Sequence, residues 1–125
     1  MNYSTHLKQI SKKGISYTGV ASTQIGITEN GTERFFPLFC VITVSSATLL
    51  TIAGTMSVGT NSASYNNILV ATAMTGLTGL YSMLTMNLTT LVSSIAANTP
   101  IFVNVTVGAT ATSSTFDVYL FGFYQ

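Results

Sequence analysis

Few side chains in this sequence have the type and spacing that catalysis or metal binding requires. Glu29 and Glu33 are the one closely spaced pair of carboxylates, and such a pair can act as general acid and base. They flank the turn signal Asn30-Gly31, so we interpret them as solvated turn residues. His6 is the only histidine, and no second histidine, cysteine or acid lies near it in the sequence, so we expect no metal site.

The remaining reactive groups are equally isolated. Cys40 lies in the apolar run Phe39–Ile42 and is expected to be a small buried hydrophobe. Asp117 stands in an apolar C-terminal segment far from His6, so no Ser-His-acid triad is indicated. A carboxylate buried there without a partner would be costly, so we expect it near a sheet edge or held by backbone N–H groups or a hydroxyl. We therefore expect no enzymatic activity and no cofactor.

The distribution of charge is the most informative property of the chain. Charged residues make up 6% of it, against about a quarter in an ordinary soluble domain. Asp117 is the only charged residue between Phe35 and Gln125. A formal net charge of +1 is too small for generic nucleic-acid binding, which needs clustered lysine and arginine. So little charge repulsion indicates that copies of the chain, other proteins or lipid cover much of the surface.

Two charge-free stretches, residues 37–58 and 68–97, are long enough to suggest membrane spans. Both are rich in Ser and Thr, which are poor lipid-facing residues, and no basic cluster flanks either of them. We therefore reject a membrane protein as the third hypothesis and expect no membrane partner.

Short apolar segments separated by turn signals predict an all-β domain. Residues 101–107 alternate between two faces, as a half-buried strand does. Asn30-Gly31 predicts a hairpin between residues 24–28 and 33–36. Residues 80–91 are ambiguous, because their leucine spacing fits a helix while their Thr and Asn side chains do not.

The first 13 residues are predicted to form a short basic N-terminal arm. They contain Lys8, Lys12 and Lys13 and few apolar side chains, so the segment is too polar to fold alone. We expect these three lysines to attach the protein to the surface of a partner. Residues 14–125 are predicted to form a jelly-roll-like β-sandwich.

The C-terminal segment, residues 115–124, carries large apolar side chains at both its even and its odd positions. A strand of a two-layer sandwich needs only one buried face, so the second face indicates contact with another subunit. The residues predicted to form this subunit interface are Phe116, Tyr119, Phe121 and Phe123.

Three stretches, Ser57–Ile68, Asn98–Val107 and Phe116–Tyr124, resemble small jelly-roll proteins of tailed-bacteriophage virions. That group comprises head decoration proteins, head-fibre bases and fibre tips. The last stretch is also similar to the final strand of the trimeric tumour-necrosis-factor and complement C1q jelly rolls, where an aromatic-Gly-aromatic strand lines the threefold contact. The resemblance covers residues 35–125 and implies a homotrimer on a protein shell, without enzymatic activity. The chain has no long fibrous region, which favours a decoration protein over a fibre.

Two functional hypotheses remain open at this point. The first is a structural virion protein on the capsid surface, a decoration or cement protein that trimerises and binds the major capsid protein or another virion protein. The alternative is a receptor- or glycan-binding tip domain of a fibre, since aromatic faces and amide side chains suit sugars. Its site would be formed by Asn61, Tyr65, Asn66 and Asn67.

Overall fold

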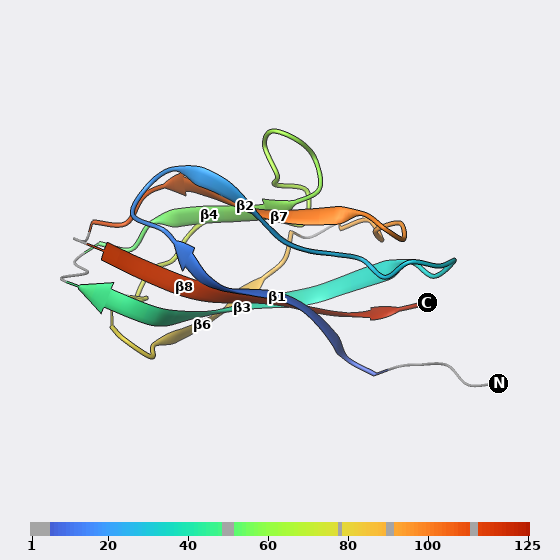
Figure 1. Ribbon diagram of the computed structural model, residues 1–125, viewed down its shortest axis with the longest axis horizontal. Helices are drawn as coiled ribbons and strands as arrows, with labels where there is room; N and C mark the ends of the chain where they lie inside the picture. The colour runs from blue at the N-terminus through green and yellow to red at the C-terminus, as the bar shows by residue number, and fades with distance from the viewer. Residues whose placement is uncertain (1–5, 49–51, 78, 90–91, 111–112) are drawn as a thin grey trace.

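The computed structural model describes residues 6–48, 52–77, 79–89, 92–110 and 113–125, and within these ranges it contains β-strands and no helix (Figure 1). The strands are β1 (Lys8–Ser16), β2 (Ala21–Ile27), β3 (Phe35–Thr48), β4 (Thr55–Gly59), β5 (Leu69–Ala73), β6 (Met83–Asn87), β7 (Pro100–Val107) and β8 (Ser113–Tyr124). They form two four-stranded sheets, with the orders β1-β8-β3-β6 and β2-β7-β4-β5.

The pairing of the strands is nested and antiparallel. β1 pairs with β8, β2 with β7, β3 with β6 and β4 with β5. This is the order of one antiparallel ribbon rolled up into two layers, the arrangement of a jelly roll. Figure 1 shows the two layers one above the other, with β3 and β8 running side by side in the lower one. The all-β sandwich predicted from the sequence is therefore confirmed.

The hydrophobic core lies between the two sheets and follows the alternation of the strands. Ile101, Val103 and Val105 of β7 are buried as predicted, whereas Val107 at the end of that strand is 57% exposed. The fully buried side chains include Tyr17, Phe35, Ile42, Met56, Leu69, Ile101, Phe116 and Leu120.

The hairpin predicted around Asn30-Gly31 is wrong. β2 and β3 lie in different sheets, so the link between them crosses the sandwich instead of turning within one sheet. Before the crossing, the N–H of Thr28 donates to the carbonyl oxygen of Thr99 at 3.0 Å. After it, Arg34 and Gln125 exchange backbone hydrogen bonds of 2.9 and 3.0 Å. Both ends of the link are therefore held by strands distant in sequence, which a local turn signal does not reveal.

The basic arm predicted over residues 1–13 is also corrected. Residues 8–13 belong to β1, which pairs with β8 along its length. The polar segment joins the sheet because β8 provides a long edge for it and because Ile10 and Ile15, 8% and 4% exposed, enter the core. The sandwich thus begins at residue 8, and residues 1–5 of the predicted arm lie outside the described residues.

The ambiguous segment over residues 80–91 contains β6, which is extended and pairs with β3 in a continuous register from Met83 to Asn87. Met86 is 4% exposed and faces the core, while Thr85 is exposed. Burial of alternate side chains favours the strand over the helix that the leucine spacing suggested.

Candidate assembly site

The outward face of the β1-β8-β3-β6 sheet carries a row of aromatic rings. The β3–β8 register places Phe36 opposite Phe123 and Phe39 opposite Phe121. Both pairs are stacked, with ring centroids 5.1 Å apart and interplanar angles of 6° and 22°. Tyr119 extends the row, its ring centroid 6.4 Å from that of Phe121. These five residues are called the aromatic face below.

All five side chains of the aromatic face are half-buried within the single chain. Stacked pairs across strands contribute about 0.5–1.5 kcal/mol each to the sheet, so part of the role of these rings lies within the subunit. Their outer surfaces remain open to solvent, and β3 and β6 bring no charged side chain to this face. On β8 the charged residue is Asp117, which shares the outward parity of Tyr119 and whose carboxylate is bonded to the N–H of Gly14. Exposed Met83, 67% accessible on β6, borders the same face. Such a surface is typical of a protein contact.

The predicted subunit-interface residues divide between the two faces of β8. Phe116 is fully buried, and its ring meets that of Tyr17 edge-on at 5.0 Å, so its assignment to a subunit interface is wrong. Even-numbered residues of β8 face the opposite sheet, and Phe116 shares that parity with Leu120. Tyr119, Phe121 and Phe123 lie on the outward face.

Sequence reasoning missed the β3 half of the aromatic face, Phe36 and Phe39. Their spacing of three residues does not fit one side of a regular strand. A register shift between Pro37 and Phe39 restores both to the outward side, opposite odd-numbered residues of β8. The available signal was the density of phenylalanines at the start of this segment, but their partners depend on the β3–β8 register.

Asp117 is the only charged residue between Phe35 and Gln125, and its carboxylate is bonded within the subunit. Its Oδ1 accepts a hydrogen bond from the backbone N–H of Gly14 at 2.9 Å. Gly14 lies in the irregular part of β1 between Lys12 and Ile15 and has a positive φ of 70°, which favours glycine. Of the alternatives expected for Asp117, the structure shows the backbone N–H, whereas β8 itself is an inner strand of its sheet. The carboxylate stabilises the bulge in β1.

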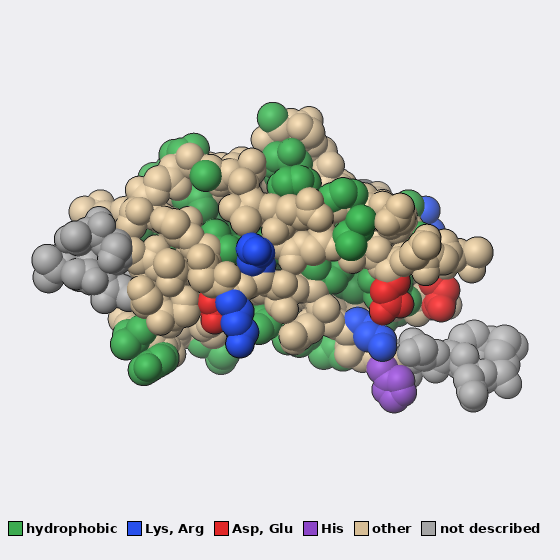
Figure 2. Space-filling model, viewed as in Figure 1, with side chains coloured by type: hydrophobic (Ala, Val, Ile, Leu, Met, Phe, Trp, Pro, Cys, Tyr) green, Lys and Arg blue, Asp and Glu red, His purple; other side chains and the backbone are tan. Residues whose placement is uncertain are grey.

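The three predicted attachment lysines, Lys8, Lys12 and Lys13, are all exposed on β1, at one edge of the sandwich. Lys8 and Lys12 lie opposite Gly122 and Val118, which gives them the same side of the sheet. Figure 2 shows how sparse such groups are, with few blue and red side chains on a mainly tan and green surface. The lysines therefore form one charged edge, carried by a strand and not by a free arm.

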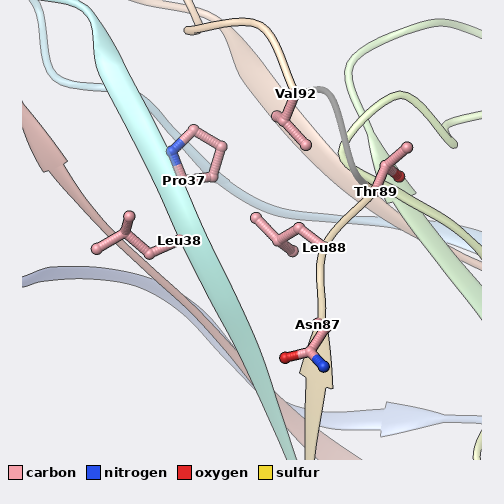
Figure 3. Close-up of a pocket in the computed structure, with 6 residues that line it drawn as sticks. All are labelled: Pro37, Leu38, Asn87, Leu88, Thr89 and Val92. Carbon is pink, nitrogen blue, oxygen red and sulfur yellow. The ribbon is translucent and has the colours of Figure 1, made fainter.

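A hollow of about 390 Å³ lies beside the start of β3, where β6 has ended. Figure 3 shows the side chains of Pro37, Leu88 and Val92 converging on it from two segments. Pro37 has no N–H to offer a neighbouring strand, which fits the end of the β3–β6 pairing at Phe39. The hollow is lined by Pro37, Leu38, Asn87, Leu88, Thr89 and Val92. Sequence reasoning did not find it.

The loop proposed as an alternative glycan site is held together by its own amides. Asn61 Oδ1 accepts the backbone N–H groups of Asn66 and Asn67 at 2.8 and 3.2 Å, and its side-chain nitrogen donates to Asn66 Oδ1 at 2.8 Å. One face of Tyr65 is covered by Phe102, with ring centroids 4.5 Å apart. These groups therefore have a structural role that accounts for their presence, and the geometry does not favour the glycan-binding alternative.

The other reactive groups that the sequence singled out are Glu29, Glu33 and Cys40. Glu29 and Glu33 line a hollow of about 220 Å³ beside Tyr124, whose hydroxyl accepts the backbone N–H of Glu29 at 2.9 Å. The described part of the chain contains no group of three or more His, Cys, Asp or Glu that could hold a metal ion. Burial raises the pKa of Cys40 to about 12, which makes it a poor nucleophile near neutral pH.

Comparison with protein-family models, with curated proteins and with solved structures finds no match to this chain. In the ranges that the structure covers, no helix has the length and hydropathy needed to cross a membrane. The function is therefore inferred from the fold and from the surfaces described above.

Proposed function

We propose that this chain is a structural protein of a virion, a decoration or cement protein that trimerises and binds the capsid shell. The aromatic face is the observation that carries this proposal. It presents five aromatic side chains from two central strands on a sheet face that β3 and β6 leave free of charge. The jelly-roll order adds support, because this topology recurs in viral capsid domains.

The aromatic face forms the contact between subunits. Full burial of a large apolar side chain is worth about 1.5–3 kcal/mol, so covering the exposed part of these five rings, at most about a third of each, yields about 2–5 kcal/mol per subunit. This gain is set against the loss of rotational and translational freedom on association. A threefold arrangement is proposed because the Phe121-Gly122-Phe123 strand resembles the one that lines the threefold contact of trimeric jelly rolls.

The charged edge formed by Lys8, Lys12 and Lys13 binds the shell. The attraction is to acidic groups of the capsid protein and is screened beyond about 8–10 Å at physiological ionic strength. Each contact is weak, but a trimer presents three copies of the edge to one surface, and simultaneous contacts raise the overall affinity without any strong single site.

The test is co-sedimentation of the purified protein with shells of the major capsid protein encoded by the same genome. Deleting residues 1–13 would remove most of β1, so the three lysines are replaced together by glutamine, with replacement by arginine as the matched control. We expect the glutamine variant to bind fewer shells at low salt and the arginine variant to bind as the wild type does. Equal binding of both variants at low and high salt would contradict attachment through the charged edge, and no binding by the wild type would contradict the decoration role.

A further inference from the structure

β6 is the outermost strand of its sheet, and its second side is open. Among the described residues its strand pairing is with β3 alone. Before β6, Val44 donates to the carbonyl of Ser82 and accepts from the N–H of Tyr81, both at 3.0 Å. Hydrogen-bonded and non-bonded positions alternate along an antiparallel pair. The backbone groups of Met83, Thr85 and Asn87 therefore point away from β3, toward the open side.

This edge lacks the features that protect an edge strand from pairing with another strand. β1, the other edge of the same sheet, carries three exposed lysines and a register shift between Lys12 and Ile15. β6 has no charged residue and no proline, and its register with β3 is continuous. An unprotected edge of this kind suits the addition of another strand.

The sequence of β6 is complementary to itself. When two copies are placed antiparallel about a twofold axis at Thr85, Met83 of one faces Asn87 of the other and Leu84 faces Met86. The residues in each pair share a face of the sheet, because Met83, Thr85 and Asn87 lie on the outward side and Leu84 and Met86 on the inward side. Thr85 faces Thr85, a pair that can exchange a hydroxyl hydrogen bond.

The surfaces on either side of β6 also match under the same axis. Tyr81, two residues before the strand, is 82% exposed. Counted past the ends of β6, the register sets Tyr81 level with position 89 of the second copy, close to the hollow beside Pro37. Thr89 itself has turned toward the other sheet there, where its N–H donates to the carbonyl oxygen of Ile68 at 3.1 Å. An exposed aromatic side chain at one end of the edge is therefore placed next to a hollow at the other end, and the twofold axis repeats this contact.

We propose that β6 pairs with β6 of a second copy of this chain, antiparallel about a twofold axis at Thr85. The two four-stranded sheets then form one continuous eight-stranded sheet. The contact uses a sheet edge and is distinct from the aromatic face, so it goes beyond the proposed trimer and links one trimer to the next. A five-residue strand buries little area, so the contact is weak in dilute solution and becomes populated at the local concentration of a particle surface.

Cysteine cross-linking of the full chain tests the register. Paired Cα atoms facing each other in a hydrogen-bonded antiparallel pair lie about 5.5 Å apart, within disulfide range. Under mild oxidation Thr85→Cys should form covalent dimers at least tenfold faster than Met83→Cys, whose cysteine lies about 14 Å from its symmetry mate. The double variant Met83→Cys with Asn87→Cys should cross-link as fast as Thr85→Cys. Equal rates for Thr85→Cys and Met83→Cys, or no cross-link from Thr85→Cys and the double variant, would overturn the proposal.

A second measurement separates this contact from the aromatic face. Sedimentation velocity from low micromolar to near-millimolar protein should show the mass rising above that of the trimer, because each trimer carries three β6 edges. Thr85→Lys should abolish this rise, because it places two like charges at each axis. Ala71→Lys on β5 is the control, adding the same charge to the edge of the other sheet, and should leave the rise intact. Phe121→Ser should dissociate the trimer and still allow the Thr85→Cys cross-link. Loss of that cross-link in the Phe121→Ser background, or a rise in mass that survives Thr85→Lys, would refute an independent β6 contact.

Discussion

Gly122 in β8 is a position at which one added methyl group should strongly destabilise the fold. A Cβ built there meets the backbone oxygen of Phe36 and lies 2.6 Å from Cζ of the Phe35 ring. Phe35 is fully buried, and its ring packs against Tyr124 with centroids 5.0 Å apart. The absence of a side chain at Gly122 is thus what allows the Phe35 ring to lie across β8.

The cost of Gly122→Ala follows from what can move. Ordinary contacts of a Cβ begin near 3.4 Å, so the Phe35 ring and the β3 backbone must both shift. Overpacking of a core costs about 1–3 kcal/mol, and displacing a backbone oxygen of the central β3–β8 pair places this variant at the upper end. We expect a loss of about 3 kcal/mol, which lowers the melting temperature by about 10 °C in a domain of this size.

The assay is thermal and urea unfolding followed by circular dichroism, at one protein concentration for all variants. Gly19→Ala is the matched control, because a Cβ at Gly19 meets nothing within 4 Å and its φ is not positive. That variant should melt within about 2 °C of the wild type or slightly above it. In the double variant Gly122→Ala with Phe35→Leu, the smaller side chain should relieve part of the clash. The double variant should therefore lose less unfolding free energy than the sum of the losses in the two single variants. Wild-type stability of Gly122→Ala would refute the packing of Phe35 over β8.

Three further predictions concern single groups. The Tyr17 hydroxyl is buried without a hydrogen bond of good geometry among the described residues, so Tyr17→Phe should be neutral or stabilising by about 1 kcal/mol in urea unfolding, and a clear loss would contradict this. Burial raises the pKa of Cys40 from 9.0 to about 12, so the neutral thiol stabilises the fold below pH 9 and this contribution is lost as the pH rises toward 12. Between pH 9 and pH 12, Cys40→Ala should therefore lose less stability than the wild type does. An identical loss in both proteins would contradict this prediction. Asp117→Ala removes the acceptor for Gly14 and should cost about 1–2 kcal/mol, whereas Asp117→Asn keeps an oxygen there and should cost less; equal losses would show that the hydrogen bond is unimportant.

Local patterns in the sequence predicted the strands but not which strands pair. The alternation of Ile101, Val103 and Val105 identified β7 and its buried face correctly. The Asn30-Gly31 hairpin failed because the neighbours of that link are Thr99 and Gln125, far away in sequence. In a jelly roll most pairings join distant segments, so a short-range turn signal carries little information about the sheet order.

The candidate site was predicted in part for a related reason. The two-faced apolar pattern of β8 identified Tyr119, Phe121 and Phe123. Phe116 lies on the other face of the strand, but the sequence does not show which of the two faces is buried. The partners Phe36 and Phe39 required the β3–β8 register and its shift at Pro37. The lysines were singled out for their charge, and only the pairing with β8 showed that they occupy a strand.

The mass of the purified protein in solution tests the central claim most directly. At low micromolar concentration, native mass spectrometry and light scattering should give three times the 13.2 kDa of the single chain. Phe121→Ser should reduce the mass to that of one chain with unchanged circular dichroism, while Val20→Ser, at a 71% exposed position outside the aromatic face, should leave the trimer intact. A wild-type protein that remains a soluble monomer of 13.2 kDa would contradict the assignment of the aromatic face as a subunit contact.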